Sequence, residues 1–182
     1  NGAQTLNKLN QLCLDTIRAS GKNNANRFVM VTGLAAAMVS YTADDSWVLP
    51  VENGDNKLII SVHMYSPYPF AMQNPGIRDF SENLTAELEF NFKWLADKFV
   101  SRGIPVVIGE YGATNKDNLE DRVKWFSYFI HESRKYGMCS VLWDNGDWNP
   151  RNTYEEKFGF YNRTEQKWYF PEIIDAIMSN VD

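Results

Sequence analysis

Short apolar runs and helical stripes alternate along this chain. Four runs are rich in β-branched and other apolar residues, a pattern typical of parallel strands that are buried on both faces. They cover residues 27–32, 57–62, 104–109 and 138–143. Between them, apolar residues recur at spacings of three and four, which predicts amphipathic helices. The alternation of strands and helices indicates a parallel α/β fold in a single domain.

The helical stripes and the residues beside them predict the limits of the helices. The stripes are Leu6, Leu9, Leu12, Cys13 and Ile17; Leu84, Leu88, Phe92, Leu95 and Phe99; Leu119, Val123, Phe126, Phe129 and Ile130; and Ile173, Ile174, Ile177 and Met178. We predict N-caps at Thr5, Ser81 and Asp117, and Pro171 in the first turn of the last helix. Gly21, Gly103 and Gly137 are the predicted stops. Residues 34–56 predict a short helix and a long loop.

The composition of the 182 residues agrees with a packed core and argues against some partners. The chain is 44% hydrophobic and has a formal net charge of −5, whereas nucleic acids and anionic membranes attract clustered Lys and Arg. No apolar run reaches the roughly 18 residues of a membrane span. The aromatic content of 14%, with 6 Trp, suits either a Trp-rich core or a sugar-binding cleft, because ring faces stack on the C–H faces of pyranoses.

Metal, redox and cofactor chemistry find no support in the sequence. The two cysteines, Cys13 and Cys139, have no paired spacing, and we interpret them as buried small hydrophobic residues. Only 2 His are present, so no metal site is expected. The chain also lacks the motifs of nucleotide binding, metalloproteases and serine hydrolases, and no cofactor is expected.

Polar and aromatic residues gather where the predicted strands end. These positions are Thr32, His63 with Tyr65, Glu110, and Trp143 with Asp144. The C-terminal ends of parallel strands form the active face of barrels and open sheets. We therefore expect the functional site at this edge of the sheet.

Glu110 is the strongest catalytic candidate. It follows an apolar strand, where a desolvated charge requires compensation. A structural alternative is a helix cap or an ion pair with Arg or Lys, and the functional interpretation is a carboxylate for covalent or acid–base work. His63 and Tyr65 are two residues apart and point the same way. Tyr65 is positioned to donate its hydroxyl to Glu110, and His63 either orients the site or serves the structure alone.

Several aromatic and polar side chains are candidates for sugar contacts. Trp143 ends a strand, and its ring serves either as a sugar platform or as part of the core. Trp148 and Tyr68 lie in rim loops and are weaker candidates. Asp144 and Asp147 suit turns in the Asp-Asn-Gly segment.

Three motifs together resemble glycoside hydrolase family 5, the cellulase family. They are His63-Met64-Tyr65-Ser66-Pro67-Tyr68, Ile108-Gly109-Glu110-Tyr111-Gly112 and Leu142-Trp143-Asp144-Asn145-Gly146. The first and third look most like subfamily 4, which acts on β-1,4-glucans, mixed-linkage glucans and xyloglucan. The resemblance covers residues 1–182 and implies a (β/α)₈ TIM barrel, of which this chain supplies the second half, strands five to eight.

The resemblance also implies roles for individual residues. Glu110 is the implied nucleophile, with His63 and Tyr65 lining the site and Tyr65 bonded to the nucleophile. Trp143 is the implied platform under the sugar at the cleavage point, and Trp148, Tyr68 and Asn145 are expected to contact the substrate. The implied activity is that of a retaining endo-β-1,4-glucanase, secreted or bound to the cell surface.

The sequence departs from the family in one respect that affects the mechanism. The acid/base Glu of the family belongs to an Asn-Glu motif after strand four, and no Asn-Glu dipeptide occurs in this chain. The chain starts at Asn1 without Met or a signal-peptide pattern, and its first helix is the one expected after strand four. We therefore expect the chain to be inactive alone and to pair with the N-terminal half of the same barrel. A dimer of two half-barrels is the less favoured alternative.

Other functions stay open at this point. Within enzymes, the alternative is another barrel β-glycanase such as a mannanase or a xylanase. Outside enzymes, the alternatives are a non-catalytic carbohydrate-binding fragment and an unrelated open-sheet protein. The last of these leaves the neighbouring positions of Trp143 and Glu110 without an explanation.

Overall fold

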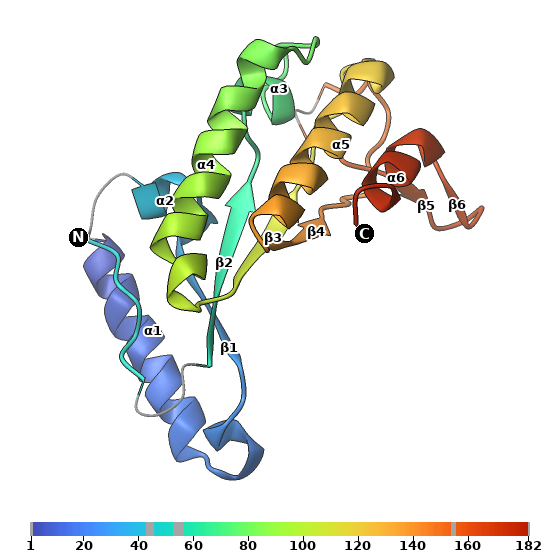
Figure 1. Cartoon of the computed structure of the whole chain (residues 1–182). Coiled ribbons are helices and arrows are strands. Elements are labelled where there is room, and N and C mark those ends of the chain that lie inside the picture. Colours follow the sequence, from blue (N-terminus) through green and yellow to red (C-terminus); the bar gives the residue numbers. More distant parts are fainter. Residues whose placement is uncertain (1, 43–45, 53–56, 154–155, 182) are drawn as a thin grey trace.

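Four parallel strands form the centre of the structure, a computed structural model that describes residues 2–42, 46–52, 57–153 and 156–181. The strands are β1 (Val29–Ala37), β2 (Leu58–Met64), β3 (Val106–Tyr111) and β4 (Cys139–Leu142). They lie side by side in chain order, and each neighbouring pair is parallel (Figure 1). The predicted α/β class and the four predicted strands are confirmed.

Helices precede, connect and follow these strands. The longer ones are α1 (Gly2–Ala19), α4 (Thr85–Lys98), α5 (Leu119–Lys135) and α6 (Pro171–Met178). Short helices α2 (Val39–Thr42) and α3 (Tyr68–Ala71) follow β1 and β2, and 3₁₀ turns form at η1 (Lys22–Ala25), η2 (Glu82–Leu84) and η3 (Val100–Arg102). The loop before α6 contains an antiparallel hairpin, β5 (Tyr161–Asn162) and β6 (Lys167–Trp168), which the sequence pattern did not indicate.

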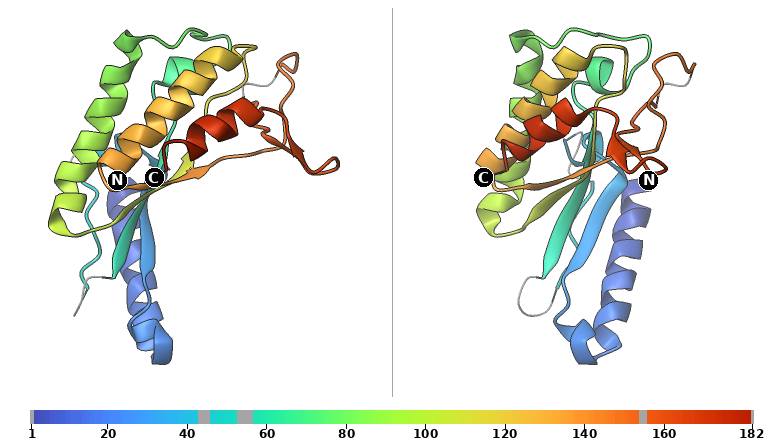
Figure 2. Two further views of the ribbon diagram at one scale, coloured as in Figure 1. Left: turned by 45° about the vertical axis from the view of Figure 1, so that its right-hand side comes forward. Right: turned by 90° about the vertical axis from the view of Figure 1, so that its right-hand side faces the viewer.

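One face of the sheet carries the hydrophobic core. Helices α4, α5 and α6 lie on this face, as Figure 2 shows, while α1 packs beside β1. Ile60, Val62 and Ile108 point toward the helices and are fully buried. Tyr111 at the end of β3 stacks on Phe129 of α5, with ring centroids 4.6 Å apart. The apolar stripes predicted for α4 and α5 are confirmed by this packing.

The opposite face of the sheet is uncovered. Met30 of β1 and Val141 of β4 lie on it and are 52% and 49% exposed. The prediction that the strands are buried on both faces is therefore wrong for this chain, because four strands do not curve far enough to close on themselves. Cys139 shares the uncovered face, and Cys13 lies on the exposed side of α1, so the prediction that both cysteines are buried is also wrong.

Helix α1 differs from its predicted form. It begins at Gly2, so Thr5 lies within the helix and is not its N-cap. Leu9 and Leu12 are exposed, whereas Leu14 is buried, because the helix packs beside β1 and bonds to residues 46–52 through polar side chains. At the other end of the chain, Pro171 is confirmed in the first turn of α6.

Ser81 takes the N-cap position of η2, which runs directly into α4, but its side chain makes no capping hydrogen bond. The predicted cap at Asp117 is wrong. Asn118 is the N-cap of α5, because Asp117 has a left-handed backbone with φ of 60° and its N–H donates to the side chain of Asn115. Gly103 and Gly137, by contrast, adopt φ of 73° and 70° and are confirmed as stops.

Strand β1 continues beyond its predicted end through a wide bulge. Thr32 pairs with Ser61 and Ala37 pairs with His63, so residues 33–36 stand opposite a single residue of β2. The hydroxyl of Tyr41 accepts the N–H of Gly33 at 2.7 Å and donates to the carbonyl of Ser61 at 2.6 Å. Buried Tyr41 therefore bridges the bulge to β2.

Candidate active site

An extra residue in β3 determines the direction of Glu110. Val62 pairs with Ile108, but the next pair is His63 with Glu110, so Gly109 is inserted into the register. Regular alternation from buried Ile108 would turn Glu110 toward the helices. The insertion reverses the alternation, so Glu110 points to the same side as His63 and Tyr111 returns to the core.

Glycine is required at this bulge. A Cβ atom at position 109 would lie 2.7 Å from Oγ of Ser61 and 3.5 Å from Cδ2 of His63. The absence of a side chain allows β3 to approach β2 where the carboxylate and the imidazole meet. Sequence reasoning did not identify this role, although a Gly directly before a strand-end Glu was a signal that could have revealed it.

Two side chains of β2 and its following loop orient the Glu110 carboxylate. The hydroxyl of Tyr65 donates to Oε2 at 2.9 Å, and Nδ1 of His63 lies 3.2 Å from the same oxygen. Among the residues that the structure describes, no other group bonds to the Glu110 carboxylate. The alternative that Glu110 caps a helix or pairs with an Arg or Lys therefore finds no support. Within this part of the chain, the Oε1 atom of Glu110 has no bonding partner and is available to react.

The environment of Tyr65 keeps its hydroxyl protonated. Burial raises the pKa of Tyr65 well above its usual range, and the hydrogen bond and negative charge of Glu110 raise it further. The phenol is therefore a donor at every pH at which such a site works. The Tyr65 hydroxyl is thus a fixed donor that holds one oxygen of the Glu110 carboxylate in place.

We expect Tyr65→Phe to lower kcat by roughly 10- to 100-fold in a complete barrel, because a hydrogen bond to a charged group contributes about 1.5–3 kcal/mol. The ring and its contact with Phe158, at 5.4 Å between centroids, remain. Steady-state kinetics on mixed-linkage β-glucan measure the effect, with Tyr136→Phe at the end of α5 as the matched control. A change below about threefold would mean that the Tyr65 hydroxyl has no part in orienting the carboxylate.

Trp143 lies next to this cluster. It directly follows β4, and its backbone N–H donates to the carbonyl of Tyr111, the residue after Glu110, at 3.0 Å. The residue is 38% exposed, so its ring is accessible in this half of the barrel. An exposed indole at a strand end beside a carboxylate suits a sugar platform.

The loop after β4 is ordered by its own Asp and Asn side chains. Asn145 donates to the carbonyl of Glu156 at 2.8 Å and accepts the N–H groups of Asp147 and Phe158 at 3.0 and 3.2 Å. Asp144 accepts the N–H groups of Gly146 and Tyr161. The expected turn roles agree with these bonds. The substrate contact of Asn145 stays a prediction, and here its side chain bonds to the backbone of the loop.

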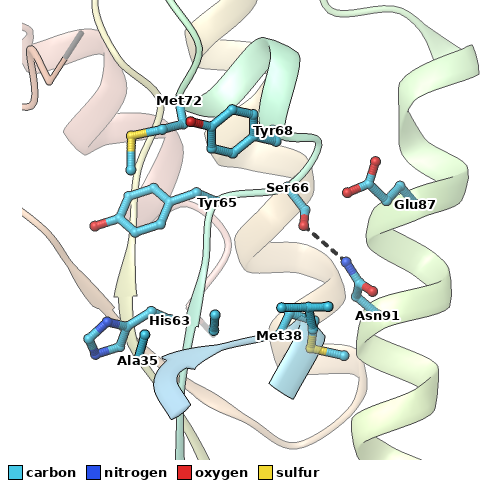
Figure 3. A pocket seen from close by; sticks show the side chains of 11 residues that line it. Ala35, Met38, His63, Tyr65, Ser66, Tyr68, Met72, Glu87 and Asn91 are labelled. Carbon is cyan, nitrogen blue, oxygen red and sulfur yellow. Dashed lines mark hydrogen bonds between the residues drawn. The ribbon is translucent and has the colours of Figure 1, made fainter. Parts of the chain in front are cut away.

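The other two aromatic candidates lie apart in the rim loops. Trp148 is 41% exposed and stacks on Tyr169, with centroids 4.9 Å apart. Tyr68, in α3, is 54% exposed and lies near Tyr65 at a cavity (Figure 3). Both rings are accessible to a ligand, and their contact with substrate stays a prediction.

A largely buried polar segment, residues 113–118, connects the loops on either side of Glu110, and only Asp117 in it is exposed. Lys116 donates through Nζ to the carbonyl of Phe70 in α3, and Thr114 N–H donates to the carbonyl of Ala71 at 2.8 Å. Asn115 donates to the carbonyl of Trp148 at 2.7 Å in the loop after β4. Sequence reasoning missed this segment, although Thr-Asn-Lys-Asp-Asn soon after β3 is an unusually polar sequence for largely buried positions.

Three cations, one of them in this segment, are buried. Lys116, Arg122 and Lys157 are at most 8% exposed. Burial lowers the pKa of Lys116 to about 8, and the positive charges of Arg122 and Lys157 contribute. The Arg122 guanidinium lies over the rings of Phe160 and Phe170 and donates Nε–H to the carbonyl of Ala113 at 3.0 Å. Aromatic and carbonyl groups thus compensate part of the charge.

Neither metal ligation nor a membrane span is found in the described part of the chain. Within residues 2–42, 46–52, 57–153 and 156–181, no three His, Cys, Asp or Glu side chains are grouped so that they would bind a metal ion. Over the same residues, every helix is too short or too polar to cross a bilayer.

The parallel strands, with a carboxylate at their C-terminal ends, place the chain in the class of (β/α)₈-barrel proteins, of which it supplies four strand–helix units. The sequence model of cellulase, glycosyl hydrolase family 5, matches residues 1–149. The chain belongs to this family, as the resemblance of its motifs implied.

Curated relatives are endoglucanases. Endoglucanase 1 of Ruminococcus albus is 40% identical over 173 residues, which are 95% of this chain and 41% of the relative. Endoglucanase B of Neocallimastix patriciarum is 36% identical over 99% of this chain and 37% of its own length. The chain therefore spans less than half the length of these relatives.

Solved structures agree with the sequence relatives. A broad-specificity endoglucanase of subfamily 5-4 from Ruminococcus champanellensis, with bound cellotriose, superposes with a TM-score of 0.88 at 36% identity. A family 5 lichenase from Caldicellulosiruptor sp. F32 gives 0.90 at 37% identity. The matches cover 97% and 99% of this chain and 50% of each structure. The prediction that this chain corresponds to half of a TIM barrel is confirmed.

Proposed function

We propose that this chain is the C-terminal half of the catalytic barrel of a retaining endo-β-1,4-glucanase, with Glu110 as the nucleophile. The observation that carries the proposal is the carboxylate of Glu110, which receives Tyr65 and His63 on one oxygen at the C-terminal end of β3. The endoglucanase and lichenase names of relatives at 36–40% identity support the substrate class. The substrates are β-glucans, with xyloglucan included.

The proposed mechanism uses the free oxygen of Glu110. This oxygen attacks the anomeric carbon as the bond to the leaving oxygen breaks, and a glycosyl ester forms on Glu110. Water then attacks the same carbon, cleaves the ester and restores the carboxylate. The hydrogen bond from Tyr65 and the contact with His63 hold the carboxylate in the attacking orientation throughout.

A second carboxyl group is required and comes from outside this chain. Retaining glycosidases place two carboxyl groups about 5–5.5 Å apart, and the second protonates the leaving oxygen and later deprotonates water. The chain contains no Asn-Glu dipeptide to supply it. We place that group on the N-terminal half of the same barrel, which would pair with the edges at β1 and β4 and cover the uncovered face of the sheet.

The proposed site of action lies outside the cell or at its surface. β-Glucan chains are polymers too large to cross a membrane, so an enzyme that cleaves them within the chain must meet them there. This assignment rests on the substrate class and on the family.

A panel of polysaccharides tests the proposed specificity. A protein that contains this chain and its N-terminal half should cleave mixed-linkage β-glucan and carboxymethylcellulose on the order of tenfold or more faster than mannan and xylan. Reducing-end assays at equal polymer mass measure these rates. Faster cleavage of mannan or xylan would indicate another β-glycanase, and binding of glucans without cleavage would indicate a carbohydrate-binding module.

A further inference from the structure

Arg122, near the start of α5, carries a guanidinium that is fully buried. The residue is 0% exposed, and its Nε–H donates to the carbonyl of Ala113 at 3.0 Å. Among the residues that the structure describes, none accepts a hydrogen bond from Nη1 or Nη2. A guanidinium is always charged and has N–H donors on all three nitrogens. Two of these nitrogens therefore lack an acceptor within the described part of the chain, where buried polar groups are normally bonded.

The aromatic rings around Arg122 compensate its charge only in part. The guanidinium carbon lies 5.2 Å from the ring centroid of Phe160 and 4.6 Å from that of Phe170. Such rings attract a cation, but they supply neither a full negative charge nor a strong hydrogen-bond acceptor. A buried charge without a hydrogen-bonded counter-charge is strongly unfavourable. Arg122 therefore requires a further compensating group.

Two lysines add positive charge to the same region. Lys116 and Lys157 are 8% and 1% exposed. After burial, the positive charges of Arg122 and Lys157 are the causes that lower the pKa of Lys116, so both cations lie within electrostatic range of it. Among the described residues, no carboxylate acts on the pKa of Lys116 or of Arg122. The region thus has an excess of buried positive charge.

The chemistry of the region favours a small monovalent anion. An anion accepts hydrogen bonds from Nη1 and Nη2 and supplies the negative charge that rings and carbonyls lack. Because Arg122 is fully buried, bulky ligands have no access to it. A water molecule would accept the hydrogen bonds but would leave the charge uncompensated. Chloride combines a full negative charge with a small spherical shape and a weakly held hydration shell.

The contacts of Arg122 indicate what a bound anion would do. Ala113 and Lys116 belong to the segment 113–118, which bonds to α3 and to the loop after β4. Phe160 and Phe170 lie between β4 and α6, so Arg122 joins α5 to both segments. Compensation of its charge would therefore stabilise the attachment of both segments to α5.

We propose that Arg122 binds a buried chloride ion through Nη1 and Nη2, that Lys116 and Lys157 add to the attraction, and that this ion stabilises the segment 113–118. The ion is a structural component of the protein and is neither a substrate nor a reactant. The inference is therefore independent of the proposed function, and its tests measure structure and stability.

Diffraction from a protein that contains both halves of the barrel tests the site directly. Crystals grown in sodium bromide should show an anomalous bromide peak within hydrogen-bonding distance of Nη1 and Nη2 of Arg122. A water molecule in this position, or a carboxylate from another part of the protein, would overturn the proposal. This experiment needs no variant, so it decides the matter even if substitutions of Arg122 prevent folding.

Thermal unfolding of the same protein tests binding in solution. We expect the melting temperature to rise by about 2–3 °C when sodium chloride replaces sodium gluconate at constant ionic strength. Arg122→Met should remove this rise. Arg134→Met is the matched control, because Arg134 is exposed in the last turn of the same helix, and this variant should keep the rise.

Two outcomes of the unfolding experiment would contradict the proposal. An equal rise in Arg122→Met and Arg134→Met would indicate a general salt effect and overturn it. A bromide peak in the crystal, without any chloride dependence of the melting temperature, would indicate an adventitious ion only and would also overturn it.

Discussion

Glu110→Gln should abolish glucan cleavage in a protein that contains both halves of the barrel, with kcat reduced on the order of 10⁴- to 10⁶-fold. The amide preserves the shape of the side chain and still accepts the hydrogen bond of Tyr65, but it is a poor nucleophile, so no glycosyl ester forms. The measurements are kcat on mixed-linkage β-glucan and, by calorimetry, the affinity for cello-oligosaccharides. We expect the affinity to stay within a few-fold of the parent.

Glu120→Gln is the matched control for this variant. Glu120 is an exposed carboxylate in the first turn of α5, and its loss should leave kcat unchanged. Retained cleavage in Glu110→Gln would show that another carboxylate is the nucleophile. If the parent and Glu110→Gln both bind glucan and neither cleaves it, the carbohydrate-binding alternative is favoured.

The isolated 182-residue chain should show no measurable glucanase activity. General acid–base catalysis contributes roughly 10²- to 10⁴-fold, and the group that provides it is not expected in this chain. The interior of the barrel is open as well, because the face of the sheet that carries Met30 and Val141 is uncovered. The loss of activity in the isolated chain should therefore exceed the loss that removal of the acid/base group alone would cause.

Assays of the purified isolated chain against a complete family 5 endoglucanase measure this difference. The same chain with Glu110→Gln reveals contaminating enzyme, because true activity must disappear with the nucleophile. Turnover that depends on Glu110 in the isolated chain would mean that a carboxyl group within the chain, or in a second copy of it, acts as the acid/base.

The sequence allowed the strands, most helices and the gathering of His63, Tyr65 and Glu110 at one edge of the sheet to be predicted. Apolar runs located β2 and β3 within two residues of their observed limits, because each strand is buried along one face. The approach of Tyr65 and His63 to Glu110 followed from a general property of parallel sheets, whose C-terminal strand ends share one edge. These inferences depend on local pattern and topology alone.

The features that the sequence did not reveal depend on register and on packing between distant segments. Simple alternation would have turned Glu110 into the core, and only the insertion of Gly109 corrects its direction. The bulge at residues 33–36 is fixed by the hydroxyl of Tyr41, which the chain brings back from α2. The exposure of Cys139 could not be read from its apolar surroundings, because burial depends on segments that must cover it.

The buried segment at residues 113–118 has a mechanical consequence for the cleft. Through Lys116 it bonds to α3, beside Tyr68, and through Asn115 to Trp148 in the loop after β4. One short piece of backbone, which begins two residues after Tyr111, therefore connects α3 with the loop after β4. The distance between the segments that carry Tyr68 and Trp148 is therefore fixed by the fold before a polysaccharide binds.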